Sequence, residues 1–270
     1  MSRKYIYPLL IILVTVGLWY AEQYIDRQQE HYPEETKTTE LSEEFGNAYM
    51  PTSTTGEVIR HNYYTLSYSE AHEQAEWVAY ELNKEHLRNN DFERPYFIQD
   101  RKVSSGSADW RNYKNSGYDR GHLVAAADRE FEYNAFHETF LTSNISPQDH
   151  DFNSGIWNRL EQKVRYWAEK YDGVFVVTGG VLQPGLKTIG SEHVSVPEKF
   201  YKIVVDASTQ PPKAIAFLIP NKPSSRSYFE YVVTIDSLET ITGIDFFPGL
   251  ETSIQNTLEN TIDKRAWTKR

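Results

Sequence analysis

The sequence predicts an α+β fold, because its strand-like segments cluster instead of alternating regularly with helices. Short apolar runs bounded by Gly, Pro or polar residues gather in the second half of the chain, which is typical of strands. A strict alternation would favour a doubly wound parallel sheet instead. The 270 residues, 39% of them hydrophobic, suffice for one large core or two smaller ones.

The expected elements follow in chain order. Val58–Tyr68 is rich in β-branched and aromatic residues and predicts a strand. Apolar residues recur at helical spacing from Ala71 to Leu82, so an amphipathic helix is expected over about 70–90. Further helices are expected at Asn158–Tyr171 and at about Ser253–Asp263. The remaining strands are predicted at Val174–Thr178, Phe200–Asp206, Ala214–Ile219 and Tyr228–Ile235.

The composition excludes several classes of site. The chain has no cysteine, which rules out disulfide scaffolds, Cys-ligated zinc, iron–sulfur clusters and thiol nucleophiles. Its formal net charge of −10 argues mildly against a nucleic-acid-binding protein, which usually has a basic footprint.

The N-terminus predicts a membrane anchor. Residues 5–21 carry no charge and follow a short basic segment, residues 1–4. Seventeen residues are at the lower limit for a transmembrane helix. The basic side is expected to stay cytoplasmic, with the bulk of the chain periplasmic or extracellular and a bacterial inner membrane favoured over a mitochondrial one. The alternative is a cleaved signal peptide and secretion, although Leu18, Trp19 and Tyr20 before Ala21 fit a cleavage site poorly.

Two further regions follow the predicted anchor. Residues 22–55 are polar and acidic, are interrupted by Pro33 and Pro51, and show no sustained periodicity. They are expected to form an acidic flexible tether. Residues 56–270 have the pattern of a globular domain.

The segment Asp119–His122 combines an acid, a guanidinium and an imidazole around a glycine. His122 is the natural general base near neutral pH, and the planar fork of Arg120 matches a phosphate. Gly121 permits an unusual backbone or a close approach of the substrate. Taken singly, each of these residues is more often structural or solvated.

A second polar group spans Asn153 to Arg165. On a helix, Asn153 and Glu161 lie on one side but roughly 12 Å apart along the axis. This spacing suits one direct metal ligand and one carboxylate that holds a metal-bound water. Arg165 follows Glu161 by four residues and can pair with it. Oxygen ligands favour Mg²⁺ over Zn²⁺. The alternative is a structural one, in which Asn153 caps the helix and Glu161–Arg165 is a surface pair.

The two motifs together resemble the DNA/RNA non-specific endonuclease family, which includes secreted bacterial nucleases and the mitochondrial endonuclease G type. The resemblance is close over about residues 94–165 and looser over most of 56–270. It implies a ββα-metal (His-metal finger) core on a mainly antiparallel sheet flanked by helices. The chain departs from the family at Ala126, where a proline is common.

The resemblance also implies the roles of site residues. His122 is expected to be the general base that activates water. Asn153 is expected to be the single protein ligand of Mg²⁺, for which Mn²⁺ can substitute. Glu161 would orient a metal-bound water, and Arg120 and Arg165 would contact the scissile phosphate or its neighbours.

Other family positions are matched less specifically. Asp119 and Asn144 are expected to support the geometry of the catalytic loops. An upstream arginine also serves the family, and either Arg94 or Arg101 can fill that place; the sequence does not decide between them.

The implied activity is Mg²⁺-dependent hydrolysis of DNA and RNA that leaves 5′-phosphate and 3′-hydroxyl ends. The overall negative charge does not oppose it, because seven basic residues against four acidic ones give the segment Arg94–Arg129 a net charge of +3. Two alternatives stay open: a catalytically silent nucleic-acid-binding module on the same fold, and a phosphodiesterase for a small phosphodiester. The sequence predicts no oligomeric state.

Overall fold

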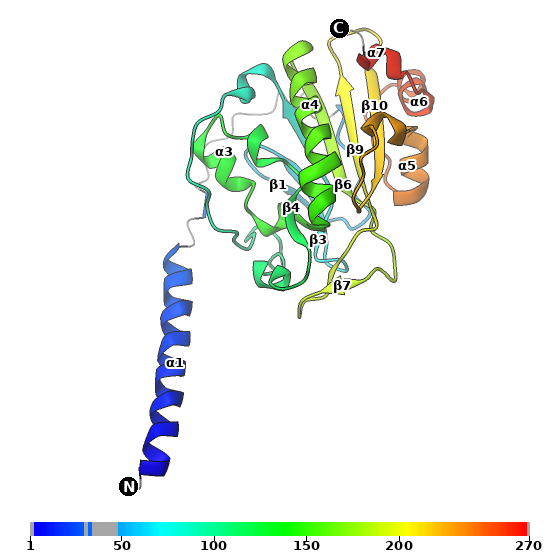
Figure 1. Ribbon diagram of the computed structural model, residues 1–270. Coiled ribbons are helices and arrows are strands. Elements are labelled where there is room, and N and C mark those ends of the chain that lie inside the picture. Colours follow the sequence, from blue (N-terminus) through cyan, green and yellow to red (C-terminus); the bar gives the residue numbers. More distant parts are fainter. Residues whose placement is uncertain (1–2, 30–31, 34–47, 269–270) are drawn as a thin grey trace. The chain divides into compact units, whose positions relative to one another are not determined.

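The computed structural model describes residues 3–29, 32–33 and 48–268 (Figure 1). The chain separates into two compact units, Met1–Pro33 and Glu34–Arg270. Helix α1 (Arg3–Gln29) lies in the first unit. Sixteen residues of the predicted 22–55 tether, 30–31 and 34–47, lie outside the described residues, and its first part, up to residue 29, is helical instead of extended.

The structure does not support the predicted transmembrane anchor at residues 5–21. In the described parts of the chain, no helix combines the length and the apolar character that crossing a bilayer requires. The uncharged run has only the minimum length for a span, and Pro8 lies within it. The predicted contact of these residues with a lipid bilayer therefore has no support either.

A seven-stranded sheet forms the centre of the second unit, and all its neighbouring strands are antiparallel. This arrangement confirms the predicted α+β class with a mainly antiparallel sheet. In spatial order the strands are β1 (Val58–Arg60), β2 (Thr65–Ser69), β3 (Gln74–Leu82), β6 (Val174–Gly180), β9 (Lys199–Asp206), β10 (Lys213–Pro220) and β11 (Val232–Val233).

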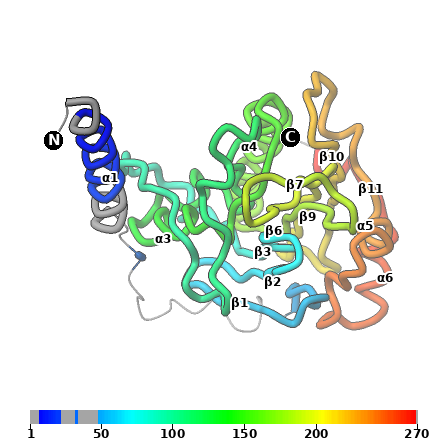
Figure 2. The backbone as a smooth tube through the Cα atoms, turned by 90° about the horizontal axis from the view of Figure 1, so that it is seen from below, coloured from blue at the N-terminus to red at the C-terminus, as the bar shows by residue number. Residues whose placement is uncertain are grey.

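The sheet has an apolar core on each face. In β6, Val174 and Val176 pack into the core beneath helix α4 (Asn158–Lys170), whereas Phe175 and Val177 pack into the core beneath helix α5 (Ile235–Thr242). Figures 1 and 2 show α4 and the α5–α6 pair on different sides of the strands. Helix α6 spans Thr252–Asn260. The alternating side chains of the strands thus serve two cores at once.

The helix predicted over about 70–90 is wrong, because Gln74–Leu82 forms β3 in the interior of the sheet. Strand β3 pairs with β2 and β6, and nearly all its residues are buried. A strand covered on both faces loses its polar–apolar alternation, so its apolar residues also fit helical spacing. The helical structure in this stretch is a 3₁₀ turn, Lys84–Leu87, capped by the Asn83 side chain.

The strand predicted over 228–235 is also largely wrong. Its first residues form a 3₁₀ turn, Tyr228–Tyr231, with Ser227 as its cap. Only the short β11 follows before α5 begins. The strand predicted over 58–68 is divided into β1 and β2. The remaining predicted strands and helices are confirmed by β6, β9, β10, α4 and α6.

A second, two-stranded sheet lies before α4 in the chain. Strands β4 (Asp119–His122) and β5 (Ile145–Gln148) pair antiparallel, and a π-helical turn, Phe152–Trp157, leads into α4. Two strands and a helix in this order form the predicted ββα unit. The other elements are α3 (Tyr133–Glu138), β7 (Thr188–Ile189), β8 (Val194–Ser195), α7 (Lys264–Thr268) and 3₁₀ turns at Trp110–Tyr113, Ala126–Asp128 and Thr142–Asn144.

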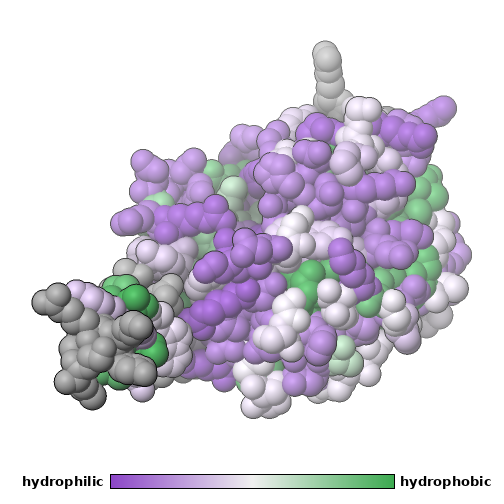
Figure 3. Space-filling model, turned by 60° about the horizontal axis from the view of Figure 1, so that its bottom comes forward, coloured by the Kyte–Doolittle hydropathy of each residue, from purple (hydrophilic) through white to green (hydrophobic). Residues whose placement is uncertain are grey.

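Hydrophilic side chains predominate over most of the second unit on the face drawn in Figure 3. Apolar side chains form only small scattered groups there. This distribution agrees with a domain that places its apolar residues in the two cores.

Candidate active site

Strand β4 presents the Asp119–His122 motif, and its register explains the glycine. Gly121 faces Ser146 across the ribbon, and a Cβ atom at Gly121 would overlap the buried Gln148 side chain. Side chains alternate along a strand, so Arg120 and His122 lie on the same face of β4. Both contact the ring of Phe97, with distances of 5.0 Å from Arg120 Cζ and 5.6 Å between the two ring centroids for His122.

A cavity of about 580 Å³ opens beside β4. Its lining contains three basic side chains, Arg94, Lys114 and Arg120, and one carboxylate, Asp119. The 3₁₀ turn at Trp110–Tyr113 contributes aromatic side chains. The full lining is Arg94, Trp110, Tyr113, Lys114, Asn115, Tyr118, Asp119, Arg120 and Asn153. A site with this excess of positive charge suits an anionic ligand.

The structure distinguishes between the two candidate upstream arginines. Arg94 lines the cavity, and its guanidinium lies over the rings of Phe97 and Phe140 at 5.6 and 5.3 Å. Arg101 is exposed and is not part of the cavity lining. Among the described residues, neither Arg94 nor Arg120 forms an ion pair with a carboxylate. Their charges are therefore available to a bound anion.

His122 is held in an aromatic environment. Its ring contacts Phe97 and, edge to face, Phe140 at a centroid distance of 5.0 Å. Its Nε2 atom is buried and has no hydrogen-bond partner among the described residues. Burial and, to a smaller extent, the charge of Arg94 lower the pKa of His122 to about 3. The imidazole is therefore neutral at physiological pH and able to accept a proton.

Asp119 and Asn153 are joined by a hydrogen bond in which Asn153 Nδ2 donates to Asp119 Oδ2 at 3.0 Å. The same carboxylate oxygen lies 3.0 Å from His150 Nδ1. Since the amide nitrogen of Asn153 is bound to a carboxylate, its amide oxygen is the atom left for a cation. An amide oxygen, nearby carboxylate oxygen and water form the hard donor set that Mg²⁺ prefers. The residues present therefore fit the divalent metal that the family implies.

Glu161 lies in a second group of charges, which we call the buried charge cluster: Asp128, Glu161, Arg165 and Lys202. Asp128 and Lys202 are buried, whereas Glu161 and Arg165 are partly exposed. Arg165 Nη1 donates to Asp128 Oδ1 at 2.8 Å. The spacing of four residues had suggested a pair between Arg165 and Glu161, but the ion pair of Arg165 is with Asp128. Tyr80 donates to the other oxygen of Asp128 at 2.9 Å. Asp128 thereby connects the loop after β4 to both the sheet and α4.

The buried charge cluster sets the ionisation of Glu161. Burial raises the pKa of Glu161 to about 7, Lys202 and Arg165 act to lower it, and Asp128 acts to raise it. Lys202 is 1% exposed, and its Nζ atom makes no hydrogen bond within the described structure. Burial also lowers the pKa of Lys202, against the opposing effect of Glu161. The two residues thus influence each other's charge from α4 and β9.

Asn144 lies beneath the loop that follows β4. Its Oδ1 accepts from Val124 N at 2.8 Å, and its Nδ2 donates to the carbonyl oxygens of Val124 and Thr139. All polar atoms of this buried side chain are therefore used to hold backbone. Such contacts fix the loop between β4 and the turn at Ala126–Asp128.

Sequence reasoning did not identify Asp128, Lys114 or Lys202 as site residues. Asp128 and Lys114 are close to the motif in sequence, but only the fold shows which carboxylate pairs with Arg165 and which lysine reaches the cavity. Lys202 lies in the strand predicted over 200–206. Lysine is rarely buried, so its position within an apolar strand was the only sequence signal for this residue.

Comparison with known proteins places this site in a family. The profile of the DNA/RNA non-specific endonuclease family matches residues 41–253. The mitochondrial nuclease EXOG of mouse is 34% identical over 239 residues, which cover 82% of this chain and 64% of that protein. The mitochondrial endonuclease G of human is 32% identical over 69% of this chain and 68% of its own length. A nuclease of Nostoc is 33% identical over 75% of this chain and 77% of its own length.

A solved structure supports the same assignment. A crystal structure of an EndoG/EndoGI complex, described as showing the mechanism of EndoG inhibition, is similar with a TM-score of 0.67 and 31% identity. The similarity covers 72% of this chain and 86% of that one.

The comparisons also correct the predicted location. A single-pass protein of the bacterial inner membrane is contradicted, because similar relatives are named as mitochondrial nucleases and no helix in the described residues can span a membrane. The short uncharged run at the N-terminus was not sufficient evidence for an anchor. The matched residues and the shared fold establish that this chain belongs to the DNA/RNA non-specific endonuclease family.

Proposed function

We propose that this chain is a divalent-metal-dependent endonuclease that hydrolyses the phosphodiester bonds of DNA and RNA. The main support is the cavity beside β4, where unpaired guanidinium groups and the oriented Asn153 amide lie next to a motif that carries a neutral imidazole. Several similar relatives are named as nucleases. We assign the activity to residues 56–270.

His122 acts as the general base. The ring is unprotonated at neutral pH, so a free ring nitrogen is present to take a proton from the water that attacks phosphorus. The aromatic contacts with Phe97 and Phe140 fix the ring plane. A fixed ring loses little entropy when the reacting water binds.

Asn153 would hold the metal through its amide oxygen, because its amide nitrogen donates to Asp119. We assign Mg²⁺ as the ion, with Mn²⁺ able to substitute. When bound, the cation stabilises the negative charge that develops on the phosphate and on the leaving 3′ oxygen. Glu161 would accept a hydrogen bond from a water of that ion and so orient it.

The cavity arginines bind the phosphate. Arg94 and Arg120 donate hydrogen bonds to non-bridging oxygens, and their contribution is largest where charge increases in the transition state. We assign Arg165 a weaker effect on the same charge, because it is paired with Asp128. Departure of the 3′ oxygen leaves 5′-phosphate and 3′-hydroxyl ends.

The test is cleavage of supercoiled plasmid and of RNA by the full chain, with Mg²⁺ or with EDTA. We expect both substrates to be cleaved only with the metal, and His122→Ala and Asn153→Ala to lose at least about 10²-fold in rate, the scale of a lost general base or metal ligand. His150→Ala is the matched control, because this histidine also contacts Asp119 but is exposed.

Each other result has a definite meaning. A folded wild type that binds DNA without cleaving it would replace the nuclease by a binding module. Cleavage that persists in EDTA would contradict the metal assignment. Equal losses in His150→Ala and His122→Ala would contradict the choice of general base.

A further inference from the structure

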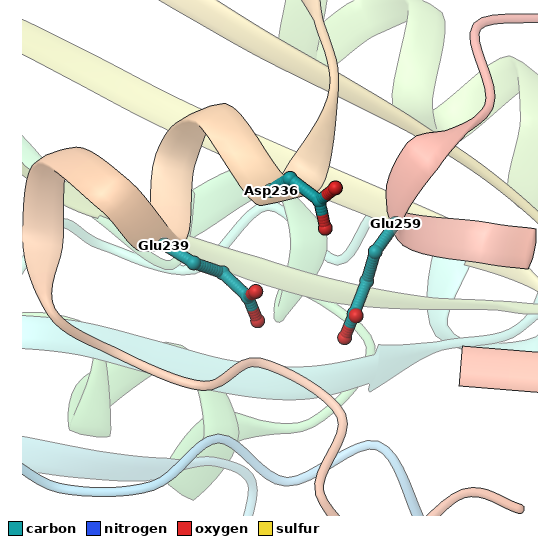
Figure 4. A group of neighbouring side chains, drawn as sticks. All are labelled: Asp236, Glu239 and Glu259. Atoms are coloured by element: carbon teal, nitrogen blue, oxygen red, sulfur yellow. The ribbon is translucent and has the colours of Figure 1, made fainter. Parts of the chain in front are cut away.

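Three carboxylates converge between the two helices α5 and α6, far along the chain from the β4 motif. Asp236 and Glu239 belong to α5 and Glu259 to α6, and one oxygen of each lies within 4.8 Å of the others. Figure 4 shows the three side chains directed toward a common space. We call this group the acidic cluster. Helix α5 packs on the core opposite to the one beneath α4, so the cluster is separate from the nuclease site.

Glu259 is the unusual member. The residue is only 5% exposed, and its Oε1 atom is buried without a hydrogen-bond partner in the described part of the chain. A buried carboxylate oxygen without a donor is unfavourable and requires an explanation such as an ion. Glu259 also lies in the last turn of α6, where the helix dipole disfavours negative charge. Both observations indicate a missing positive charge at this position.

The surroundings add negative charge. The charged groups with the largest effects on the pKa values of Glu239 and Glu259 are other carboxylates, including Asp245. Burial and these neighbours raise the pKa of Glu259 to about 7 and raise that of Glu239. Hydrogen bonds compensate only in part: Phe246 N donates to Glu239 Oε1 at 2.9 Å, a hydrogen bond with Glu259 lowers the pKa of Glu239, and one with Gln255 lowers the pKa of Glu259.

We propose that Asp236, Glu239 and Glu259 bind one Ca²⁺ ion. The three carboxylate oxygens lie close enough together to share one cation. Ca²⁺ takes several carboxylates together with water in a flexible geometry, whereas Mg²⁺ is usually held by only one or two carboxylates. Asp236 and Glu239 are partly exposed, which leaves room for waters to complete the usual 6–8 ligands.

The bound ion would connect α6 to α5, because the carboxylates of the two helices would be attracted to one shared cation instead of repelling each other. Glu259 lies beyond the residues matched by the family profile, which end at 253. The site thus joins a helix of the matched region to the segment that follows it. With water completing the coordination, we expect a Kd on the order of 10⁻⁴ M, as in weaker calcium-binding modules.

The test uses the full chain, stripped of metal with EDTA and then dialysed. Ca²⁺ alone is titrated by calorimetry, and the Tm is followed in parallel. We expect one Ca²⁺ per chain and a higher Tm, with binding at least tenfold weaker in Glu259→Gln and in Asp236→Asn. Glu169→Gln, which removes an exposed carboxylate from α4, is the matched control and should bind Ca²⁺ like the wild type.

The Asn153→Ala background separates this ion from the catalytic one. Binding that is retained in Asn153→Ala and lost in Glu259→Gln supports the acidic cluster, whether or not the nuclease proposal holds. No binding to the wild type, binding lost in Asn153→Ala, or unchanged binding in Glu259→Gln would overturn the site. If Glu259→Gln does not fold, the partly exposed Asp236→Asn decides between the same outcomes.

Discussion

In the cavity, Arg94 and Arg120 lie on aromatic rings and make no ion pair within the described structure, whereas in the buried charge cluster Arg165 is bound to Asp128. The same kind of side chain therefore has two uses. An arginine supported only by rings keeps its donors for a ligand, while an arginine paired with a carboxylate fixes the position and ionisation of its neighbours. We therefore expect substitutions in the cavity to change binding and those in the buried charge cluster to change the pH dependence.

The largest effect is expected from Glu161→Gln, which removes the carboxylate but keeps the shape. We expect a loss of about 10²-fold in kcat. Because the pKa of Glu161 is raised to about 7, the active carboxylate form exists above that pH, and wild-type activity should fall as the pH drops through 7. His122, with its pKa near 3, adds no such fall above pH 5. Rate measurements from pH 5 to 9 should show this acid limb in the wild type and not in the variant; a limb that survives would exclude Glu161.

A smaller effect is expected from Lys202→Met. Without this buried cation, the pKa of Glu161 should rise further, so that activity at pH 6 falls nearly tenfold, as expected for a pKa increase of about one unit. Raising the pH should recover most of the loss. Lys199→Met, an exposed position in the same strand, is the control and should leave the profile unchanged. If the loss of activity in Lys202→Met does not depend on pH, Lys202 contributes to packing and does not control the ionisation of Glu161.

The third comparison is between Arg94→Ala and Arg101→Ala. Only Arg94 lines the cavity, so its loss should raise KM for a short DNA duplex about tenfold, the value of one charge-assisted hydrogen bond. Arg101→Ala should change KM by less than about twofold. Steady-state kinetics at one fixed salt concentration can measure both, and the reverse order would show that Arg101 is the upstream arginine.

The smallest effect concerns salt. Removal of one phosphate contact should reduce the slope of log affinity against log salt concentration by about one. We expect this change in Arg120→Ala but not in Lys202→Met, measured by DNA-binding titrations from 50 to 200 mM salt in the presence of EDTA to prevent cleavage. If the slope changes equally in both variants, the cavity and the buried charge cluster do not differ in phosphate binding.

Much of the fold was predictable from local patterns, because β6, β9 and β10 are bounded apolar runs and α4 has one apolar stripe. Strand β3 was not predictable, because burial on both faces left no polar–apolar alternation to mark it, and even Gln74 and Glu76 are buried. Tertiary pairing with β2 and β6 determined its conformation, and local spacing did not.

The site was predictable to a different degree. The structure places the motif residues on β4, on the turn Phe152–Trp157 and on α4, because each part of the motif is local in sequence. Their catalytic roles stay predictions. The pairing of Arg165 with Asp128 and the burial of Lys202 depend on contacts between distant segments. The placement of Arg94 on Phe97 is local, yet the sequence could not distinguish it from Arg101, because both are basic residues upstream of the motif.

The shared contact at Phe97 makes recognition of the substrate depend on one neutral side chain. Arg94, Arg120 and His122 all rest against this ring, so a change in its size would displace two phosphate-binding groups and the general base together. Substitutions at these three positions should therefore not be energetically independent, and a double variant of Arg94 and Arg120 would lose less than the sum of its parts. Phe97, which carries no charge, thus determines how strongly the effects of single substitutions at the three charged or titratable positions depend on one another.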